Sequence, residues 1–153
     1  MKNSIRLLLI DSALASLVNS NADHESRATI SSFSNSLSST FNAQQLQEIR
    51  WLTLDPEDGE NNLTSLSDLS HFPNLQGLYI ENASKITDFS PIWQLKDTLE
   101  YLEIEGARSP DFSGMSQLSK LRSLDLDSCQ LTNLNFLGSF PQLTQLYLTG
   151  NHL

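Results

Sequence analysis

Acidic side chains recur at regular spacing in the second half of the sequence. The stretch LRSLDLDSC at 121–129 contains Asp125 and Asp127, each preceded by a leucine. Such alternation is typical of a strand whose leucines face a core and whose aspartates face the other side. Carboxylates arranged in this way could exchange protons, bind a metal ion or attract a basic partner.

The sequence argues against the first two chemistries. Exposed, stacked carboxylates lack the pocket that would separate their pKa values for acid–base catalysis. The acidic loop DPEDGENN at 55–62 lacks the D-x-D-x-D-G spacing of a calcium loop. The histidines have no zinc spacing: His24, His71 and His152. No glycine-rich phosphate loop is present, so we expect no enzyme activity, no catalytic residue, no metal and no cofactor.

A repeated leucine frame positions the carboxylates. The pattern L-x-x-L-x-L, with isoleucine at some positions, begins at residues 49, 75, 99, 121 and 143, which are 26, 24, 22 and 22 residues apart. This period lies within the 20–29 residues of leucine-rich repeats. Each repeat is expected to contribute one short strand, and the strands to stack in parallel about 4.8 Å apart around a shared apolar core.

The repeats over about residues 46–153 resemble the 22-residue leucine-rich repeats of internalins and of the regulatory subunits of protein phosphatase 1. The segments KITDFSPIWQL at 85–95 and QLTNLNFLGSFPQL at 130–143 carry an apolar residue, a turn and a second apolar cluster, as those repeats do. The resemblance implies an α/β fold, a leucine-rich-repeat solenoid with a curved parallel sheet on its concave face.

The chain departs from this family at the ninth repeat position, which usually holds Asn or Cys. The five residues found there are Glu57, Ala83, Ala107, Cys129 and Asn151. Because only the last two match, the first three turns must satisfy their backbone groups by water or by altered turn geometry.

We expect two regions, an N-terminal cap at 1–48 and five leucine-rich repeats at 49–153, the last incomplete. Within the cap, apolar residues at steps of three, four and four predict a helix at about 25–41. These residues are Ile30, Phe33, Leu37 and Phe41. The segment IRLLLID at 5–11 could begin a helix, but it matches IRWLTLD at 49–55 in pattern, and we favour a strand at 5–10 joined to the sheet.

The outward strand positions, the third, fifth and seventh of each frame, hold six carboxylates, all three tyrosines and one of the two tryptophans. None of these fifteen positions holds Lys or Arg. Neighbouring carboxylates about 5 Å apart repel by roughly 0.8 kcal/mol in a water-like dielectric, and a surface selected only for solubility would mix signs. Exposed aromatic residues beside charge favour a protein-binding surface. The predicted partner-binding residues are Trp51, Asp55, Tyr79, Glu81, Tyr101, Glu103, Glu105, Asp125, Asp127 and Tyr147.

The overall charge indicates the class of partner. A net charge of −9 and a pI of about 4.5 argue against nucleic acid and anionic membranes. They favour a protein with a Lys/Arg-rich surface. The chain is therefore predicted to be a non-catalytic interaction module. It could serve as an inhibitor or immunity protein of a toxin, or as an adaptor or scaffold, including the N-terminal part of a longer repeat protein.

The sequence also indicates where the protein is located and how it could associate with itself. A single cysteine fits a reducing compartment, and Asp11 interrupts the apolar run of MKNSIRLLLID that would otherwise resemble a secretory signal. No run approaches the ~20 apolar residues of a membrane span. We therefore expect a cytoplasmic protein. The last strand, at about 145–149, is expected to be an exposed edge able to pair with another chain; a homodimer or a further C-terminal segment of the native chain would each satisfy it.

Overall fold

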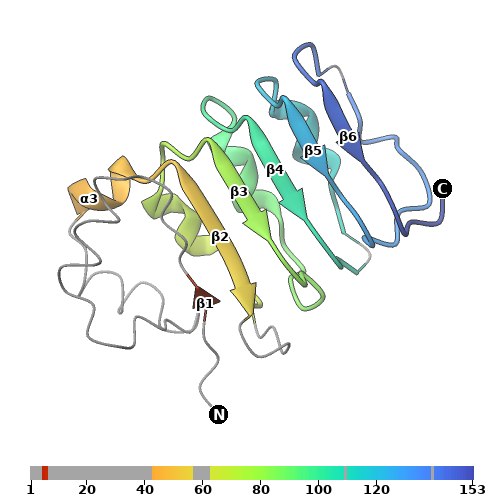
Figure 1. Ribbon diagram of the computed structural model, residues 1–153, viewed down its shortest axis with the longest axis horizontal. Helices are drawn as coiled ribbons and strands as arrows, with labels where there is room; N and C mark the ends of the chain where they lie inside the picture. The colour runs from red at the N-terminus through yellow and green to blue at the C-terminus, as the bar shows by residue number, and fades with distance from the viewer. Residues whose placement is uncertain (1–4, 7–42, 57–62, 109, 139) are drawn as a thin grey trace.

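The computed structural model describes residues 5–6, 43–56, 63–108, 110–138 and 140–153. Within these residues six strands form one sheet in the order β1-β2-β3-β4-β5-β6 (Figure 1). Strands β2 to β6 run parallel, as the repeat pattern predicts, and β1 is antiparallel to β2. The strands are β1 (Ile5–Arg6), β2 (Trp51–Pro56), β3 (Gly77–Ile80), β4 (Tyr101–Ile104), β5 (Ser123–Asp125) and β6 (Gln145–Tyr147).

The register of the parallel strands follows the leucine frame without a slip. Trp51 lies beside Gly77, Gly77 beside Tyr101, and Tyr101 beside Ser123. Since side chains alternate between the two faces of a strand, this register aligns equivalent frame positions into columns across the sheet. The predicted columns at the third, fourth and fifth frame positions are therefore confirmed.

The frame leucines form the core. In the fourth-position column, Leu52, Leu78, Leu102 and Leu124 are at most 2% exposed. Leu146 is their equivalent in β6 and is 41% exposed. The difference arises because β6 is the last strand of the described sheet, so no further repeat covers its core side.

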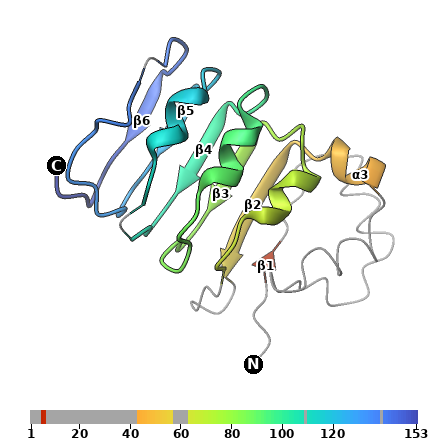
Figure 2. The same ribbon diagram turned by 180° about the vertical axis from the view of Figure 1, so that it is seen from behind.

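Short helices cover one face of the sheet (Figure 2). They are the 3-10 helices η2 (Ser67–His71), η3 (Ser90–Leu95) and η4 (Ser113–Gln117), whereas the α-helix α3 (Ala43–Glu48) lies at the β2 end of the sheet. Beneath them, Phe112 packs edge-on against Phe89 and Phe136, with ring centroids 5.2 and 5.6 Å apart. These phenylalanines link successive repeats on the side of the molecule away from the outward strand positions.

An aspartate lies two residues before each of the helices η3 and η4. The Asp88 carboxylate accepts a hydrogen bond from the Ser90 N–H, and the Asp111 carboxylate accepts one from the Ser113 N–H, both at 2.9 Å. Side-chain bonds of this kind close the turn before a helix. Hydrogen bonding to Ser90 and Ser113 lowers the pKa of both aspartates.

The ninth repeat position satisfies the backbone differently from repeat to repeat. The Asn151 amide donates to the carbonyls of Leu126 and Leu148 at 2.8 and 2.9 Å, and its oxygen accepts the Leu131 N–H at 3.0 Å. The Cys129 thiol donates to the Ile104 carbonyl at 3.1 Å, and burial raises its pKa to about 11. Where Ala83 stands, the backbone N–H donates to the Glu105 carbonyl at 2.6 Å. The residue before the ninth position has a positive φ in all four described repeats, so the turns with Ala83 and Ala107 do not differ in this respect from those with Cys129 and Asn151.

The N-terminal region is described only in part. In β1, Ile5 pairs with Pro56 and Arg6 with Asp55. A strand therefore joins the sheet here, but it runs antiparallel rather than as a further copy of the repeat. Helix α3, which lies inside the predicted cap, was not expected. Residues 7–10, the helix predicted at 25–41 and the acidic loop at 57–62 lie outside the described residues. None of the described helices is long and apolar enough to traverse a bilayer.

Candidate protein-interaction site

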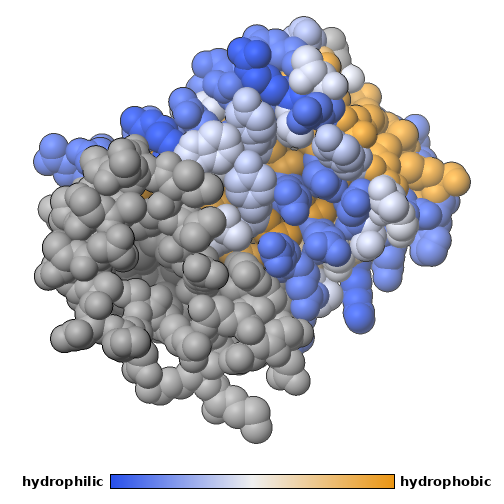
Figure 3. All heavy atoms as spheres, in the orientation of Figure 1, coloured by the Kyte–Doolittle hydropathy of each residue, from blue (hydrophilic) through white to orange (hydrophobic). Residues whose placement is uncertain are grey.

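The sheet face opposite the short helices, here called the open face, carries the third, fifth and seventh frame positions. Figure 3 shows that pale, moderately polar side chains gather over β2 to β4 and hydrophilic side chains over β4 and β5. Hydrophobic side chains are visible at the β6 end, where Leu146, from the core side of the sheet, is 41% exposed and Tyr147, on the open face, is 47% exposed. The open face is thus divided into zones of different chemistry.

Three aromatic side chains from three neighbouring strands form the first zone, here called the aromatic cluster: Trp51, Tyr79 and Tyr101. The rings of Trp51 and Tyr79 are stacked, with centroids 6.1 Å apart and planes 15° apart. The centroids of Trp51 and Tyr101 are 5.1 Å apart. All three side chains are half-buried. Since each ring supports another, the cluster presents a pre-formed surface.

Gly77 makes the aromatic cluster possible. It stands between Trp51 and Tyr101 in the third-position column. A Cβ atom built at Gly77 would lie 2.1 Å from Cε3 of Trp51, so the indole ring occupies the space of the missing side chain and reaches Tyr101 two strands away. The predicted site residues omit Gly77. A glycine inside a strand commonly marks such a close approach, and that signal could have identified it.

Five carboxylates form the second zone, here called the carboxylate cluster: Glu81, Glu103, Glu105, Asp125 and Asp127. Glu103 lies at its centre, between Tyr79 and Asp125 in the fifth-position column. Burial, followed by repulsion from Asp125 and the other carboxylates of the cluster, raises the pKa of Glu103. Burial and the nearby Glu103 likewise raise the pKa of Tyr79. The two zones therefore meet at Tyr79, Tyr101 and Glu103.

Two members of the carboxylate cluster also bind the backbone. The Asp125 carboxylate accepts the Asp127 N–H at 3.0 Å, and the Asp127 carboxylate accepts the Thr149 N–H of the next repeat. Burial raises the pKa of Asp125, partly offset by its bond to the Asp127 backbone. The sequence pattern did not indicate this structural role, which depends on how the chain turns after β5. Substituting Asp127 would remove a backbone hydrogen bond as well as a charge. Substitutions at Glu103 and Glu105 are therefore better tests of how the negative charge contributes to binding.

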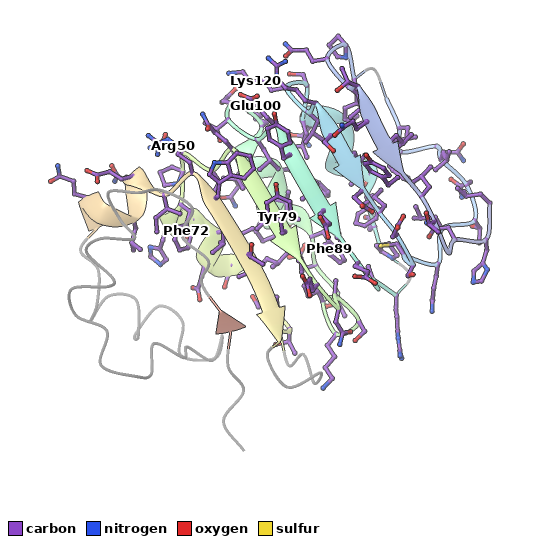
Figure 4. The ribbon with its side chains drawn as sticks, viewed as in Figure 1. Arg50, Phe72, Tyr79, Phe89, Glu100 and Lys120 are labelled. Carbon is purple, nitrogen blue, oxygen red and sulfur yellow. The ribbon has the colours of Figure 1, made fainter. Side chains whose placement is uncertain are left out.

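Arg50 and Lys120 lie at the edge of the sheet where the strands begin (Figure 4). The Arg122 guanidinium pairs with Glu100, with Nε and Oε2 2.8 Å apart. The Arg50 guanidinium and the Lys120 ammonium donate to backbone carbonyls at 2.8 and 2.6 Å. Among the described residues, none of these cations and no other Lys or Arg forms a salt bridge with Glu103, Glu105, Asp125 or Asp127.

The remaining predicted residues lie at the margins of the two zones. Tyr147 lies beside Asp125 in the register, at the β6 end. Asp55 belongs to β2, but its side chain lies outside the described residues, so its place in the acidic column stays a prediction. Within the described part of the chain, no group of histidine, cysteine or acidic residues is arranged to hold a metal ion.

Comparison with known proteins supports the repeat architecture. No protein-family model and no curated protein matches the sequence. Internalin C2 from Listeria monocytogenes is similar in structure, with 31% sequence identity and a TM-score of 0.58 over 71% of this chain and 45% of the internalin chain. Internalin F from the same bacterium shares 25% identity, with a TM-score of 0.45, over 71% of this chain and 37% of that chain.

This chain therefore spans less than half the length of either internalin. The likeness to internalin C2 agrees with the five in-register parallel strands and with the buried leucine frame. From these observations, the chain is a leucine-rich-repeat protein, an α/β solenoid that resembles the internalins.

Proposed function

We propose that this protein is a non-catalytic module that binds another protein with a Lys/Arg-rich surface through its open face. The observation that carries the proposal is that the aromatic cluster and the carboxylate cluster adjoin on neighbouring strands, where Tyr79 is the register partner of Glu103. Tyrosine and tryptophan are enriched in protein-binding surfaces, and clustered carboxylates complement a basic partner. The internalin-like repeat fold supports an interaction role in general.

The two zones would contribute to binding in different ways. The clustered carboxylates create a negative electrostatic field that accelerates the encounter with a basic partner. Added salt weakens this effect. Aromatic anchors mainly slow dissociation, because they become buried at the centre of an interface. Burial first, and repulsion by neighbouring carboxylates second, raise the pKa of Glu103 and Asp125, so their ionised forms are disfavoured in the free protein. A bound cation favours those ionised forms.

Such a module could block a basic active site, as an inhibitor or immunity protein of a toxin does. Alternatively, it could hold its partner without blocking it, as an adaptor does. The open face supports binding in both cases, and the partner's own activity separates them. An inhibitor abolishes that activity at stoichiometric concentration, whereas an adaptor leaves it intact.

Affinity capture from the source cell with charge-matched variants tests the proposal. The open-face variant is Glu103→Lys with Glu105→Lys, and the control is Glu48→Lys with Asp97→Lys, which changes the net charge equally at exposed positions outside the open face. We expect the wild-type protein and the control to retain one basic protein that salt elutes, and the open-face variant to lose it. Equal retention by both variants would contradict the proposal.

A further inference from the structure

We infer that the aromatic cluster and Glu103 together form a receptor for one arginine side chain of the partner. This inference rests on the proposed function and specifies which group the open face recognises. It follows from three features of the site: a rigid aromatic surface, a carboxylate next to that surface, and the lack of a cation of the protein's own at that carboxylate within the described residues.

The first step is the position of Glu103 relative to the rings. Tyr79 and Glu103 are register partners on β3 and β4, and neighbouring strands lie about 4.8 Å apart. Tyr101 precedes Glu103 by two residues on the same strand face, which corresponds to about 6.6 Å along the strand. A planar cation lying on either tyrosine ring therefore has the Glu103 carboxylate within reach of its edge.

The second step is the rigidity of the aromatic surface. Trp51 contacts both tyrosines, with ring centroids 6.1 and 5.1 Å away, and its own ring is seated over Gly77. The rings therefore lose little conformational freedom when a ligand side chain settles on them. Pre-organisation of this kind strengthens binding without adding contacts.

The third step is the unfavourable electrostatic environment of the Glu103 carboxylate. This carboxylate is half-buried and surrounded by four other carboxylates. Arg122, by contrast, is paired with Glu100 at the edge of the sheet where the strands begin. A cation supplied by the partner would replace repulsion by attraction at the point where the two zones meet.

Arginine fits this site better than lysine. The guanidinium is planar and stacks on aromatic faces while offering two parallel N–H donors to a carboxylate. It is also less strongly hydrated than an ammonium group, so that its transfer to a half-buried surface is easier. An ammonium group can lie over a ring, but it cannot stack and pair with a carboxylate in one plane.

A fluorescence titration tests the inference directly. The protein has two tryptophans, and Trp93 lies in η3, against the core on the helical side of the sheet. In a Trp93→Phe background, Trp51 alone reports on the aromatic cluster. The probes are two capped tetrapeptides, tetra-arginine and tetra-lysine, which carry equal charge.

We expect tetra-arginine to change the Trp51 emission saturably and to bind roughly 3- to 10-fold more tightly than tetra-lysine. Glu103→Gln should reduce this preference, whereas the control Glu105→Gln should weaken both peptides equally. Tyr101→Ala should abolish the preference, with circular dichroism confirming the fold. Equal affinity for the two peptides in the wild-type site would overturn the inference while leaving a general basic partner possible. If neither peptide bound, although a captured basic protein still bound at the open face, the arginine receptor would also be excluded.

Discussion

The indole ring of Trp51 lies over Gly77 on the neighbouring strand, in the space where a side chain would otherwise stand. A second pair on the opposite side of the sheet shows the same relationship. There a Cβ atom at Gly114 would lie 2.4 Å from Cδ1 and Nε1 of Trp93. The two pairs differ in what the tryptophan touches, because Trp51 supports the tyrosines of the open face and Trp93 packs against the core.

Gly77→Ala should displace Trp51 and disorganise the aromatic cluster. We expect a destabilisation of about 1–3 kcal/mol, as for other overpacked sites, a changed Trp51 emission and weaker partner binding. Gly114→Ala is the matched control, because it displaces Trp93 with a similar effect on stability and should leave binding unchanged. Urea denaturation and a binding assay on both variants provide the measurement. Equal loss of binding in the two variants would show that the aromatic cluster has no special role.

The raised pKa of Glu103 makes stability depend on pH in a defined direction. A carboxyl group whose pKa is higher in the folded than in the unfolded protein favours folding while it is protonated. This contribution is lost as the pH rises from the ordinary value of 4.5 through the raised value. The free energy of unfolding of Glu103→Gln, relative to the wild type, should therefore increase across that range and then level off.

Asp88→Asn provides a comparison in which the dependence of stability on pH has the opposite direction. The folded pKa of Asp88 is lowered, so its contribution is present above the ordinary value of 3.8 and is lost as the pH falls through the folded value. Chemical denaturation at several pH values measures both trends. A stability difference for Glu103→Gln that stayed constant or shrank with rising pH would contradict the raised pKa of Glu103.

Two leucines in one column test the core. Leu124 is fully buried, whereas its equivalent Leu146 is 41% exposed. We expect Leu124→Ala to destabilise the protein by about 2–5 kcal/mol, enough to unfold a marginal domain, and Leu146→Ala to have an effect below about 1 kcal/mol. Thermal melting compares the two variants. Similar melting temperatures would mean that the assigned repeat register is wrong.

For a chain that ends at residue 153, the β6 edge is expected to mediate self-association. Edge strands with exposed apolar side chains readily pair with another chain, and Leu146 and Tyr147 are both exposed there. We expect a concentration-dependent homodimer in sedimentation velocity, with two β6 strands antiparallel across a two-fold axis. Leu146→Lys should shift it to monomer while preserving the melting temperature. A monomer at every concentration, or a dimer unaffected by the substitution, would exclude this interface.

The sequence was sufficient to predict the columns of the sheet. Because the period of the frame leucines is set by core burial, the register of Trp51, Tyr79 and Glu103 could be derived before any coordinates. Side-chain directions could not be derived in the same way. The position of Trp51 over Gly77 depends on packing among three strands, and the bond from Thr149 to Asp127 depends on the turns that follow β5 and β6.

The N-terminal region shows a different limit. The segment beginning at Ile5 matches a repeat strand in pattern, but β1 pairs antiparallel with β2. Apolar alternation indicates a strand without fixing its direction, because either direction places the same residues on the same face. Helix α3 is only six residues long, too short for its apolar spacing to stand out in the sequence.

The salt dependence of the association rate tests the central claim most directly. With the captured partner in hand, stopped-flow kinetics compare the wild-type protein with the Glu103→Lys and Glu105→Lys double variant and with the Glu48→Lys and Asp97→Lys control. We expect the wild-type and control rates to fall steeply with added salt, and the open-face variant to associate about tenfold or more slowly at low salt with a much weaker salt dependence. Equal rates and equal salt dependence for the open-face variant and the wild type would show that the carboxylate cluster is solvated surface and that the partner binds elsewhere.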